Sequence, residues 1–387
     1  MDIIFLLGAV QAFFFGFLLL DKGNNRLPPK LLLVFFSIIG FVLIEHYLFQ
    51  RKIIFEYPHL IGLTYTFPII LGPILFFYTK SLVNENIAIS FRNFLLHAVP
   101  FIFITTFLIY DFYFLSQQEK LIYYEKETQG DTSSFIYFAE FFINFSIPFY
   151  SIVSLLLLKK HLKHIKLSFS NTKNIDLHWL KIVLICMVFV SFVSVLMGLL
   201  SDYFNFISFE DGDNLMYITL TIIIYFLGYY GIKQKPIVSN DNPILQIETT
   251  PTQKSKYASS SLKDVEKEKL TQWLTISMEN EKPYLNENLT LKELADKLET
   301  TPNNLSQIIN EKFNKNFYEF INEYRINEVK SLLADPKYSH YSMLGIAFEC
   351  GFNSKSTFNS VFKQFTGKTP TEFKKSVVSF SGKSNLS

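Results

Sequence analysis

Two stretches near the C-terminus, residues 303–310 and 355–363, each place polar side chains on one face of an expected helix. These side chains carry amide, hydroxyl or ammonium groups. In residues 355–366 the apolar residues Phe358, Val361, Phe362 and Phe365 follow the spacing i, i+3, i+4, i+7, which predicts one buried stripe and one free face. Amides can pair with adenine, ammonium groups with guanine, and hydroxyls with either base. The candidates for contacts with base edges are Asn303, Asn304, Ser306, Gln307, Asn310, Lys355, Ser356, Thr357, Asn359, Ser360 and Lys363.

Basic residues next to these faces predict contacts with a phosphate backbone. Residues 263–335 carry a net charge of −4, whereas residues 336–387 carry +5. We therefore expect phosphate attraction mainly from the last fifty residues. The candidates are Lys315, Lys368, Thr369, Lys374 and Lys375.

The two stretches belong to two copies of one unit. Residues 291–298 align with residues 343–350 at an offset of 52, and residues 305–320 align with residues 358–373 at an offset of 53. Each copy predicts a helix, a short turn and a second helix, with one extra residue in the second turn. Residues 317–334 between the copies predict a rigid helix about 27 Å long, close to the ~34 Å between successive major grooves on one face of DNA.

These residues resemble the AraC/XylS family of bacterial transcription regulators over about residues 285–375. The stretch "IAFECGFNSKSTFNSVFKQFTGKTPTEFKK" is very similar to the family's C-terminal signature, and "YRINEVKSLL" resembles its connecting helix. Two positions of the first copy depart from the family's pattern. Glu299 occupies a turn position where a small residue is usual, and Asn314 replaces a glycine. The resemblance implies a double helix-turn-helix domain that binds double-stranded DNA, no catalytic activity, and no cofactor.

The first 233 residues are much more apolar than the rest. A bilayer core about 30 Å thick needs roughly 20 helical residues, and seven segments fit this length. The expected spans are residues 2–20, 31–49, 60–79, 94–115, 135–158, 182–200 and 215–233. Residues 2–20 are interpreted as a retained span and not as a signal peptide, because no basic segment precedes them and no small-residue cleavage site follows.

Lysine and arginine are distributed unequally between the loops. The first, third and fifth loops carry eleven of these residues and the alternate loops carry four. By the positive-inside rule the N-terminus lies outside and the C-terminus lies in the cytoplasm of a multi-pass inner-membrane protein. Fused in this way, the chain resembles membrane-bound regulators of the same type in Bacteroidota. The expected fold is all-α, with a seven-span sensor bundle at 1–233, a flexible linker at 234–260, the DNA-binding domain at 261–378 and a tail at 379–387.

Four ionisable residues fall within or at the edges of the expected spans. Charged groups at membrane depth are costly, and so indicate functional sites. Glu45, His46, Asp111 and Glu140 are all placed toward the outer side and are candidates for one ligand pocket. The alternative is that they reach the interface among the tyrosines of an aromatic belt.

Enzyme motifs are not found, and "HLKH" at 161–164 is better explained as part of a basic loop facing lipid headgroups than as a metal site. The sequence thus favours a membrane-tethered transcription regulator. The alternatives are a membrane receptor or transporter whose cytoplasmic domain docks a protein, and an enzyme embedded in the spans. The expected partners are promoter DNA, the lipid bilayer and RNA polymerase; a small or membrane-borne signal and a second copy of the chain are left open.

Overall fold

The computed structural model describes residues 2–20, 27–84, 90–128, 133–173, 175–204, 209–233, 264–338 and 340–374. These residues form two compact units. The first contains Met1–Lys159 and Leu177–Ser239, and the second contains Lys160–Asp176 and Asn240–Ser387. In the described part of the chain the elements are helical apart from one isolated β-bridge, which agrees with the expected all-α class.

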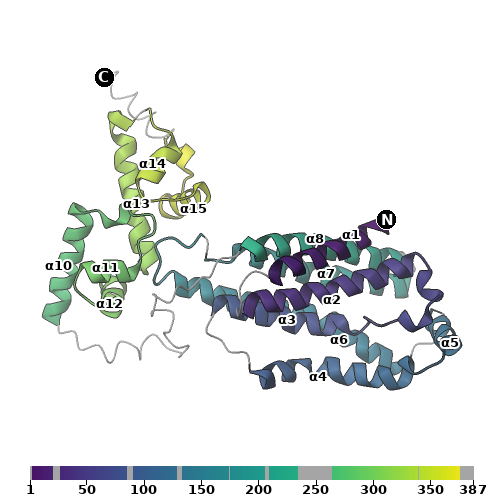
Figure 1. The fold of residues 1–387 in the computed structure, drawn as a ribbon. Coiled ribbons are helices and arrows are strands. Elements are labelled where there is room, and N and C mark those ends of the chain that lie inside the picture. The colour runs from purple at the N-terminus through teal and green to yellow at the C-terminus, as the bar shows by residue number, and fades with distance from the viewer. Residues whose placement is uncertain are drawn as a thin grey trace. The chain divides into compact units, whose positions relative to one another are not determined.

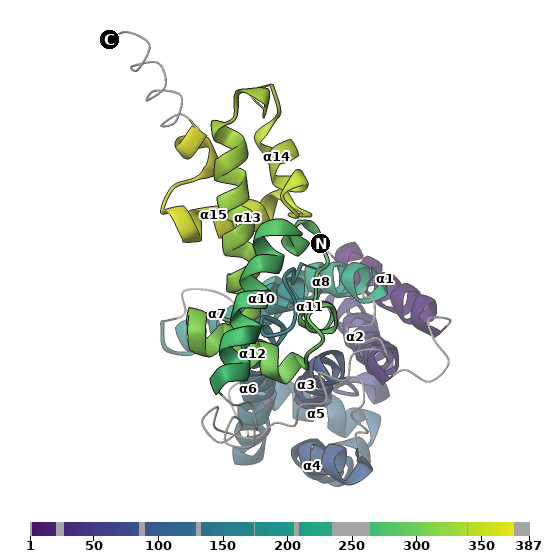
Figure 2. The ribbon, with the colours of Figure 1, turned by 90° about the vertical axis from the view of Figure 1, so that its left-hand side faces the viewer.

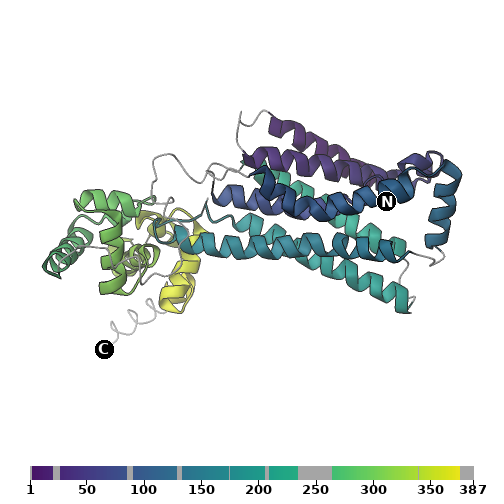
Figure 3. The same ribbon diagram turned by 90° about the horizontal axis from the view of Figure 1, so that it is seen from below.

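The first unit is a bundle of long apolar helices that run side by side (Figures 1 and 3). Its long helices are α1 (Ile3–Leu20), α2 (Leu27–Gln50), α3 (Phe67–Val83), α4 (Phe91–Leu108), α6 (Ser134–Ile165), α7 (His178–Phe204) and α8 (Phe209–Lys233). At one end of the bundle lie short elements: the 3-10 turns η1 (Ile53–Phe55) and η2 (Pro58–Leu60), the π-turn η3 (Ile109–Tyr113), and the helix α5 (Gln117–Thr128).

Six of these helices are long and apolar enough to cross a bilayer. The seventh expected span corresponds to α3, a shorter apolar helix of 17 residues. It begins at Phe67 and not at residue 60. Gly62 has a φ of +74°, outside the helical region, and Pro68 suits the first turn of a helix that starts just before it. The count of seven spans therefore stays a prediction.

Small residues bring helices of this unit close together. A Cβ at Gly228 of α8 would lie 2.1 Å from the ring of Phe15 on α1, and one at Gly72 of α3 would lie 2.8 Å from the carbonyl oxygen of Ser146 on α6. Large apolar side chains remain on the outside, among them Phe17 and Phe189, which are 70% and 64% exposed. Close contacts at small residues and apolar outer faces are both typical of helices packed in lipid.

The second unit is built around one long helix. Its elements are α10 (Asp264–Asn280), η5 (Pro283–Leu285), α11 (Leu291–Lys297), α12 (Pro302–Phe313), α13 (Phe317–Ala334), η6 (Pro336–Tyr338), α14 (Met343–Glu349) and α15 (Lys355–Thr366). Figures 1 and 2 show α10, α11 and α12 beside one part of α13, and α14 and α15 beside the other. The connecting helix has the bounds that the sequence predicts.

The internal repeat is confirmed by the helix bounds. The first helices of the two copies, α11 and α14, each have seven residues and are offset by 52; the second helices, α12 and α15, each have twelve and are offset by 53. The turns share a hydrogen bond, from Thr300 N to Ala295 O at 2.9 Å and from Phe352 N to Ala347 O at 3.0 Å. Each copy closes its own apolar core against α13.

Candidate nucleic-acid interface

Helix α15 presents an open polar face. Its apolar residues Phe358, Val361 and Phe362 are at most 1% exposed, because they pack against α13 and α14. The opposite side carries Lys355, Ser356, Asn359, Ser360 and Lys363, all exposed, and Thr357 is half-buried. The candidates predicted on this helix therefore share one accessible face.

The N-terminus of α15 is fixed by its cap. Ser354 accepts a hydrogen bond from Thr357 N at 3.2 Å, and its hydroxyl donates to Thr357 Oγ1 at 2.8 Å. The first turn of the helix is thereby set, along with the direction of Lys355 and Ser356. This turn is the part of a recognition helix that approaches base edges in helix-turn-helix proteins.

Helix α12 presents a smaller polar face than the sequence suggests. Asn303 is exposed, and Asn304, Ser306 and Asn310 are half-buried. Gln307 is only 2% exposed, and its amide donates to Glu311 Oε1 at 2.8 Å. The placement of Gln307 on the free face is therefore wrong. Its position lies at the border of the apolar stripe, where α10 covers this part of α12.

Asn310 also turns toward its own helix. Its Nδ2 donates to the carbonyl oxygen of Ser306 at 2.7 Å and approaches Ser306 Oγ at 3.4 Å. In the equivalent position α15 has Lys363, which is exposed. The bond to Ser306 O uses one of the two N–H donors of the Asn310 amide.

The phosphate candidates differ between the two copies. Lys315 forms an ion pair with Glu323 on α13, whereas Lys368 is exposed and Thr369 caps the short helical turn that follows by accepting from Glu372 N at 3.4 Å. Lys374 is half-buried, and Lys375 lies outside the described residues. The second copy thus leaves more of its positive charge free.

Ion pairs neutralise much of the first copy. Lys267 lies 3.0 Å from Glu311, and Lys312 lies 3.1 Å from Glu268, so both pairs join α10 to α12. The hydrogen bonds from Gln307 and Lys267 hold the pKa of Glu311 below its usual value. In the described residues, Lys355, Lys363 and Lys368 form no ion pair.

A buried arginine on α13 connects the two copies. Arg325 is 1% exposed, and it donates to Tyr284 O and Asn286 O, each at 2.8 Å. Burial lowers the pKa of Arg325 to about 10, which leaves it protonated at neutral pH. Gly351, in the turn of the second copy, has a φ of +86° and lies so close that a Cβ would be 3.0 Å from Arg325 Nε.

The four ionisable candidates of the membrane segments are not brought together. Glu45 accepts from Thr64 N at 2.7 Å and from the Thr64 hydroxyl, whereas His46 stacks on Tyr217 and lies 3.1 Å from Asn214 Oδ1. Adjacent helical residues point about 100° apart, which explains the separation. Asp111 is exposed on the π-turn, and Glu140 is half-buried on α6. A single pocket lined by all four is not found in the described residues.

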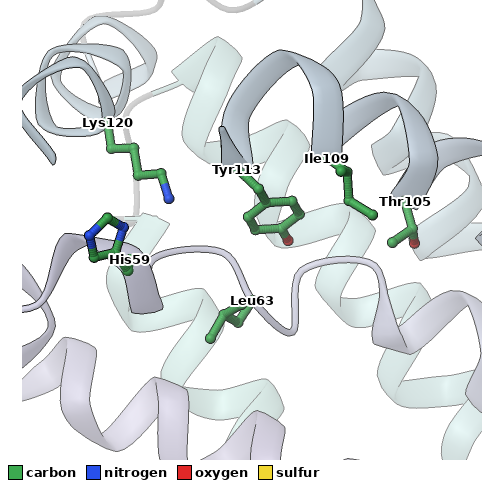
Figure 4. A pocket seen from close by; sticks show the side chains of 6 residues that line it. All are labelled: His59, Leu63, Thr105, Ile109, Tyr113 and Lys120. Carbon is green, nitrogen blue, oxygen red and sulfur yellow. The ribbon is translucent and has the colours of Figure 1, made fainter. Parts of the chain in front are cut away.

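A different cavity, of about 400 Å³, lies at the end of the bundle that holds η2 and α5. Figure 4 shows Lys120 extending into it between His59 and Tyr113. Lys120 is 2% exposed, and its ammonium nitrogen lies 5.5 Å from the ring centre of Phe112. The remaining lining residues are Leu63, Thr105 and Ile109.

Lys120 and Arg325 were not singled out by the sequence. In the sequence Lys120 is one charge among those of an expected outer loop, and nothing there indicates that α5 folds back over η3. Arg325 lies in "YRINEVKSLL", and its polar character in an otherwise apolar helix face is the one available signal.

Comparison with known proteins supports the C-terminal resemblance. A helix-turn-helix domain family matches residues 294–376. A helix-turn-helix-type transcriptional regulator of Staphylococcus aureus strain COL, itself uncharacterised, is 31% identical over 91 residues, which are 24% of this chain and 12% of the relative. The melibiose operon regulatory protein of Escherichia coli K12 is 31% identical over 87 residues, 22% of this chain and 28% of that protein. The chain thus spans only about an eighth and about a quarter of the length of these two relatives. No solved structure matches the chain.

Proposed function

We propose that this protein is a membrane-tethered, sequence-specific DNA-binding transcription regulator. The observation that carries the proposal is the pair of helix-turn-helix copies fixed on one rigid helix, α13, with an open polar face on α15. An 18-residue helix is about 27 Å long. It can therefore hold two recognition helices near the ~34 Å spacing of successive major grooves.

The proposal of a membrane tether is supported by the six long apolar helices and by the large apolar side chains on their outer faces. Its direction is supported by a contact within the second unit. Ser170 N donates to Leu289 O at 3.2 Å, so the loop between α6 and α7 lies on the same side as the C-terminal domain. Two proposed spans, α7 and α8, lie between that loop and residue 234. Two crossings would bring the chain back to the side of the membrane on which the loop lies. The lysine-rich character of the loop supports the proposal that this side is the cytoplasm.

The cavity that contains Lys120 is the site we assign to the incoming signal. A buried ammonium group among apolar and aromatic walls favours a small molecule with an anionic group on an apolar body. Among the described residues, the Lys120 ammonium group makes no hydrogen bond or ion pair, and it lies against the rings of Phe112 and Tyr113. Replacing Lys120 with methionine should change reporter transcription about fivefold or more. Lys126→Met on the exposed side of the same helix is the matched control and should leave transcription unchanged.

Chromatin mapping of the tagged full chain, followed by gel-shift of the mapped fragments with protein in nanodiscs, tests DNA binding directly. We expect sequence-selective binding whose log affinity falls steeply with log salt concentration. Equal binding to scrambled fragments, or a slope of log affinity against log salt concentration near zero, would exclude the function of a sequence-specific DNA-binding regulator. The same result would favour the alternative, in which the C-terminal domain docks a protein partner.

A further inference from the structure

The loop between α6 and α7 is part of the second unit and adds a short edge strand to it. Phe169 and Thr290 form an antiparallel bridge, with hydrogen bonds from Leu291 N to Ser168 O at 2.9 Å and from Ser170 N to Leu289 O at 3.2 Å. The loop segment thereby pairs with the chain just before α11, the first helix of the first copy.

The backbone N–H, the hydroxyl and the carbonyl oxygen of Ser170 all form hydrogen bonds with the C-terminal domain. Its hydroxyl donates to Leu289 O at 2.6 Å and accepts from Arg325 Nη2 at 3.1 Å. Its carbonyl oxygen accepts from Asn322 Nδ2 at 3.1 Å and from Arg325 Nη1 at 3.3 Å. Ser170 and Arg325 are 1% exposed and Asn322 is fully buried, so these bonds are shielded from water. Shielding makes such bonds costly to break, because each partner would be left unsatisfied.

The loop is also bound at the start of α13. Tyr318 N, one of the amides that a helix N-terminus leaves without an internal partner, donates to Lys166 O at 3.0 Å. The Lys166 ammonium nitrogen lies 5.0 Å from the centre of the Tyr318 ring. At the base of the loop, His161 is 3% exposed and its Nε2 donates to Ile175 O at 2.8 Å, which closes the loop on itself.

The residues that receive the loop also hold both helix-turn-helix copies. Arg325 binds the carbonyl oxygens of Tyr284 and Asn286 before the first copy, and its guanidinium carbon lies 5.9 Å from the ring centre of Phe352 in the turn of the second. Two of the five oxygen acceptors at its terminal nitrogens and Nε belong to Ser170. A buried charge needs such partners, so removal of the loop changes the surroundings of Arg325.

Helix α6 runs without a break from the apolar bundle to the start of this loop. It has 32 residues, about 48 Å at 1.5 Å per residue, whereas a bilayer core is about 30 Å thick. The helix therefore continues well beyond a span and ends at Ile165, one residue before the first docking contact at Lys166. The other covalent route to the DNA-binding domain, residues 234–263, is thirty residues long and lies outside the described residues.

We propose that residues 166–172 are a docked segment and that Leu289, Thr290, Leu291, Asn322 and Arg325 are its docking site. Through this contact, movements of α6 and α7 reach the element that positions both recognition helices. This inference deepens the proposed function by naming the surface that passes the signal from the bundle to the DNA-binding domain.

A disulfide across the bridge tests the docking in the full chain. Phe169 and Thr290 are a non-hydrogen-bonded pair of the antiparallel bridge. The Cα atoms of such a pair are about 4.5 Å apart, which lies within the ~4.4–6.8 Å that a disulfide spans. The variant carries Phe169→Cys, Thr290→Cys and Cys186→Ala, with a protease site inserted in residues 236–260. After mild oxidation in membranes and cleavage of the linker, we expect the two fragments to migrate together until a reductant is added.

Lys173→Cys with Thr290→Cys is the matched control, because Lys173 belongs to the same loop and is exposed. This pair should crosslink about tenfold less at equal oxidation times. Adding Ser170→Pro to the first pair removes the N–H that binds Leu289 O, and should also lower crosslinking about tenfold. Equal crosslinking of the two cysteine pairs would overturn the docking.

The regulatory role has a separate readout. Ser170→Pro, and Ser170→Ala as a milder change, should alter reporter transcription about fivefold or more at unchanged protein abundance. Normal transcription from both variants, despite lost crosslinking, would overturn the role of the contact in signalling. Gel-shift with the same proteins keeps this outcome distinct from a failure of DNA binding itself, since crosslinking does not depend on DNA.

Discussion

The turn of the second helix-turn-helix copy contains Gly351, and the equivalent position of the first contains Glu299. Both residues adopt the left-handed conformation, with φ values of +86° and +51°, and the hydrogen bonds of the two turns correspond. The surroundings differ. A Cβ at Gly351 would lie 2.4 Å from Tyr284 O, because this turn packs against η5, whereas the Glu299 side chain is exposed.

The two copies also differ in how many of their lysines are held in ion pairs. The first copy ties its lysines to glutamates of α10 and α13, as in the pairs formed by Lys312 and Lys315, and the second leaves Lys355, Lys363 and Lys368 exposed. We therefore propose that the first copy mainly stabilises the domain and that the second copy makes most of the contacts with DNA. Four predictions test this division, from the largest expected effect to the smallest.

Gly351→Ala should have the largest effect. The new Cβ meets two backbone oxygens and the residue must keep a positive φ, so we expect the unfolding free energy of the C-terminal domain to fall by about 2–4 kcal/mol. Amide hydrogen exchange of the full chain, read on peptides from α14 and α15, measures this loss.

Gly367→Ala is the matched control for that substitution. Gly367 has a φ of +72° with nothing within 4 Å of its Cβ position, so only the conformational cost, about 1 kcal/mol, applies. Equal losses in the two variants would mean that packing of the second turn against η5 contributes nothing.

Asn359→Ala should relax base selection by the second copy. Asn359 is exposed on α15, and its equivalent in the first copy is Ser306, whose carbonyl and hydroxyl oxygens face Asn310. We expect discrimination at one base pair to fall by about 1–3 kcal/mol for Asn359→Ala, and by less for Ser306→Ala. Competition gel-shifts with single-base variants of the mapped site measure both, and a larger loss from Ser306→Ala would reverse the assignment.

Lys368→Gln should weaken binding to all sequences alike. Each lost phosphate contact reduces the slope of log affinity against log salt by about 0.9. Lys312→Gln in the first copy removes an ammonium group already paired with Glu268, so its slope should change little. Binding isotherms at several salt concentrations give both slopes, and the division between the copies fails if Lys312→Gln has the greater effect.

The repeat shows how far sequence reasoning extends. Its offset of 52 and then 53 correctly predicts the paired helix lengths, the longer second turn and the bounds of α13, because apolar spacing along a helix is a local property. The exposure of Gln307 could not be predicted in the same way. It depends on α10, which reaches α12 from forty residues earlier in the chain.

The docked segment is harder still to foresee. Residues 166–172 bind the domain through one bridge, the polar groups of Ser170 and the contacts of Lys166 with Tyr318, which leave no periodic pattern in the sequence. The separation of Glu45, His46, Asp111 and Glu140 in the structure has a related reason. The position of a residue along a span predicts its depth in the membrane, but it does not predict the direction of the side chain around the helix.

Glu299→Gly should have the smallest effect and the opposite sign. A left-handed backbone costs an ordinary residue about 1–2 kcal/mol, and glycine removes this cost but adds about 0.4–1 kcal/mol of unfolded-chain entropy. The net result should be a gain of several tenths of a kcal/mol, seen as slower amide exchange in α11 and α12. Asn314→Gly, at a φ of +52°, should gain less, because asparagine tolerates this conformation better than glutamate. If Glu299→Gly instead destabilised the first copy, the glutamate side chain would have a stabilising role in the turn, and the two copies would differ in their turns more than their shared backbone suggests.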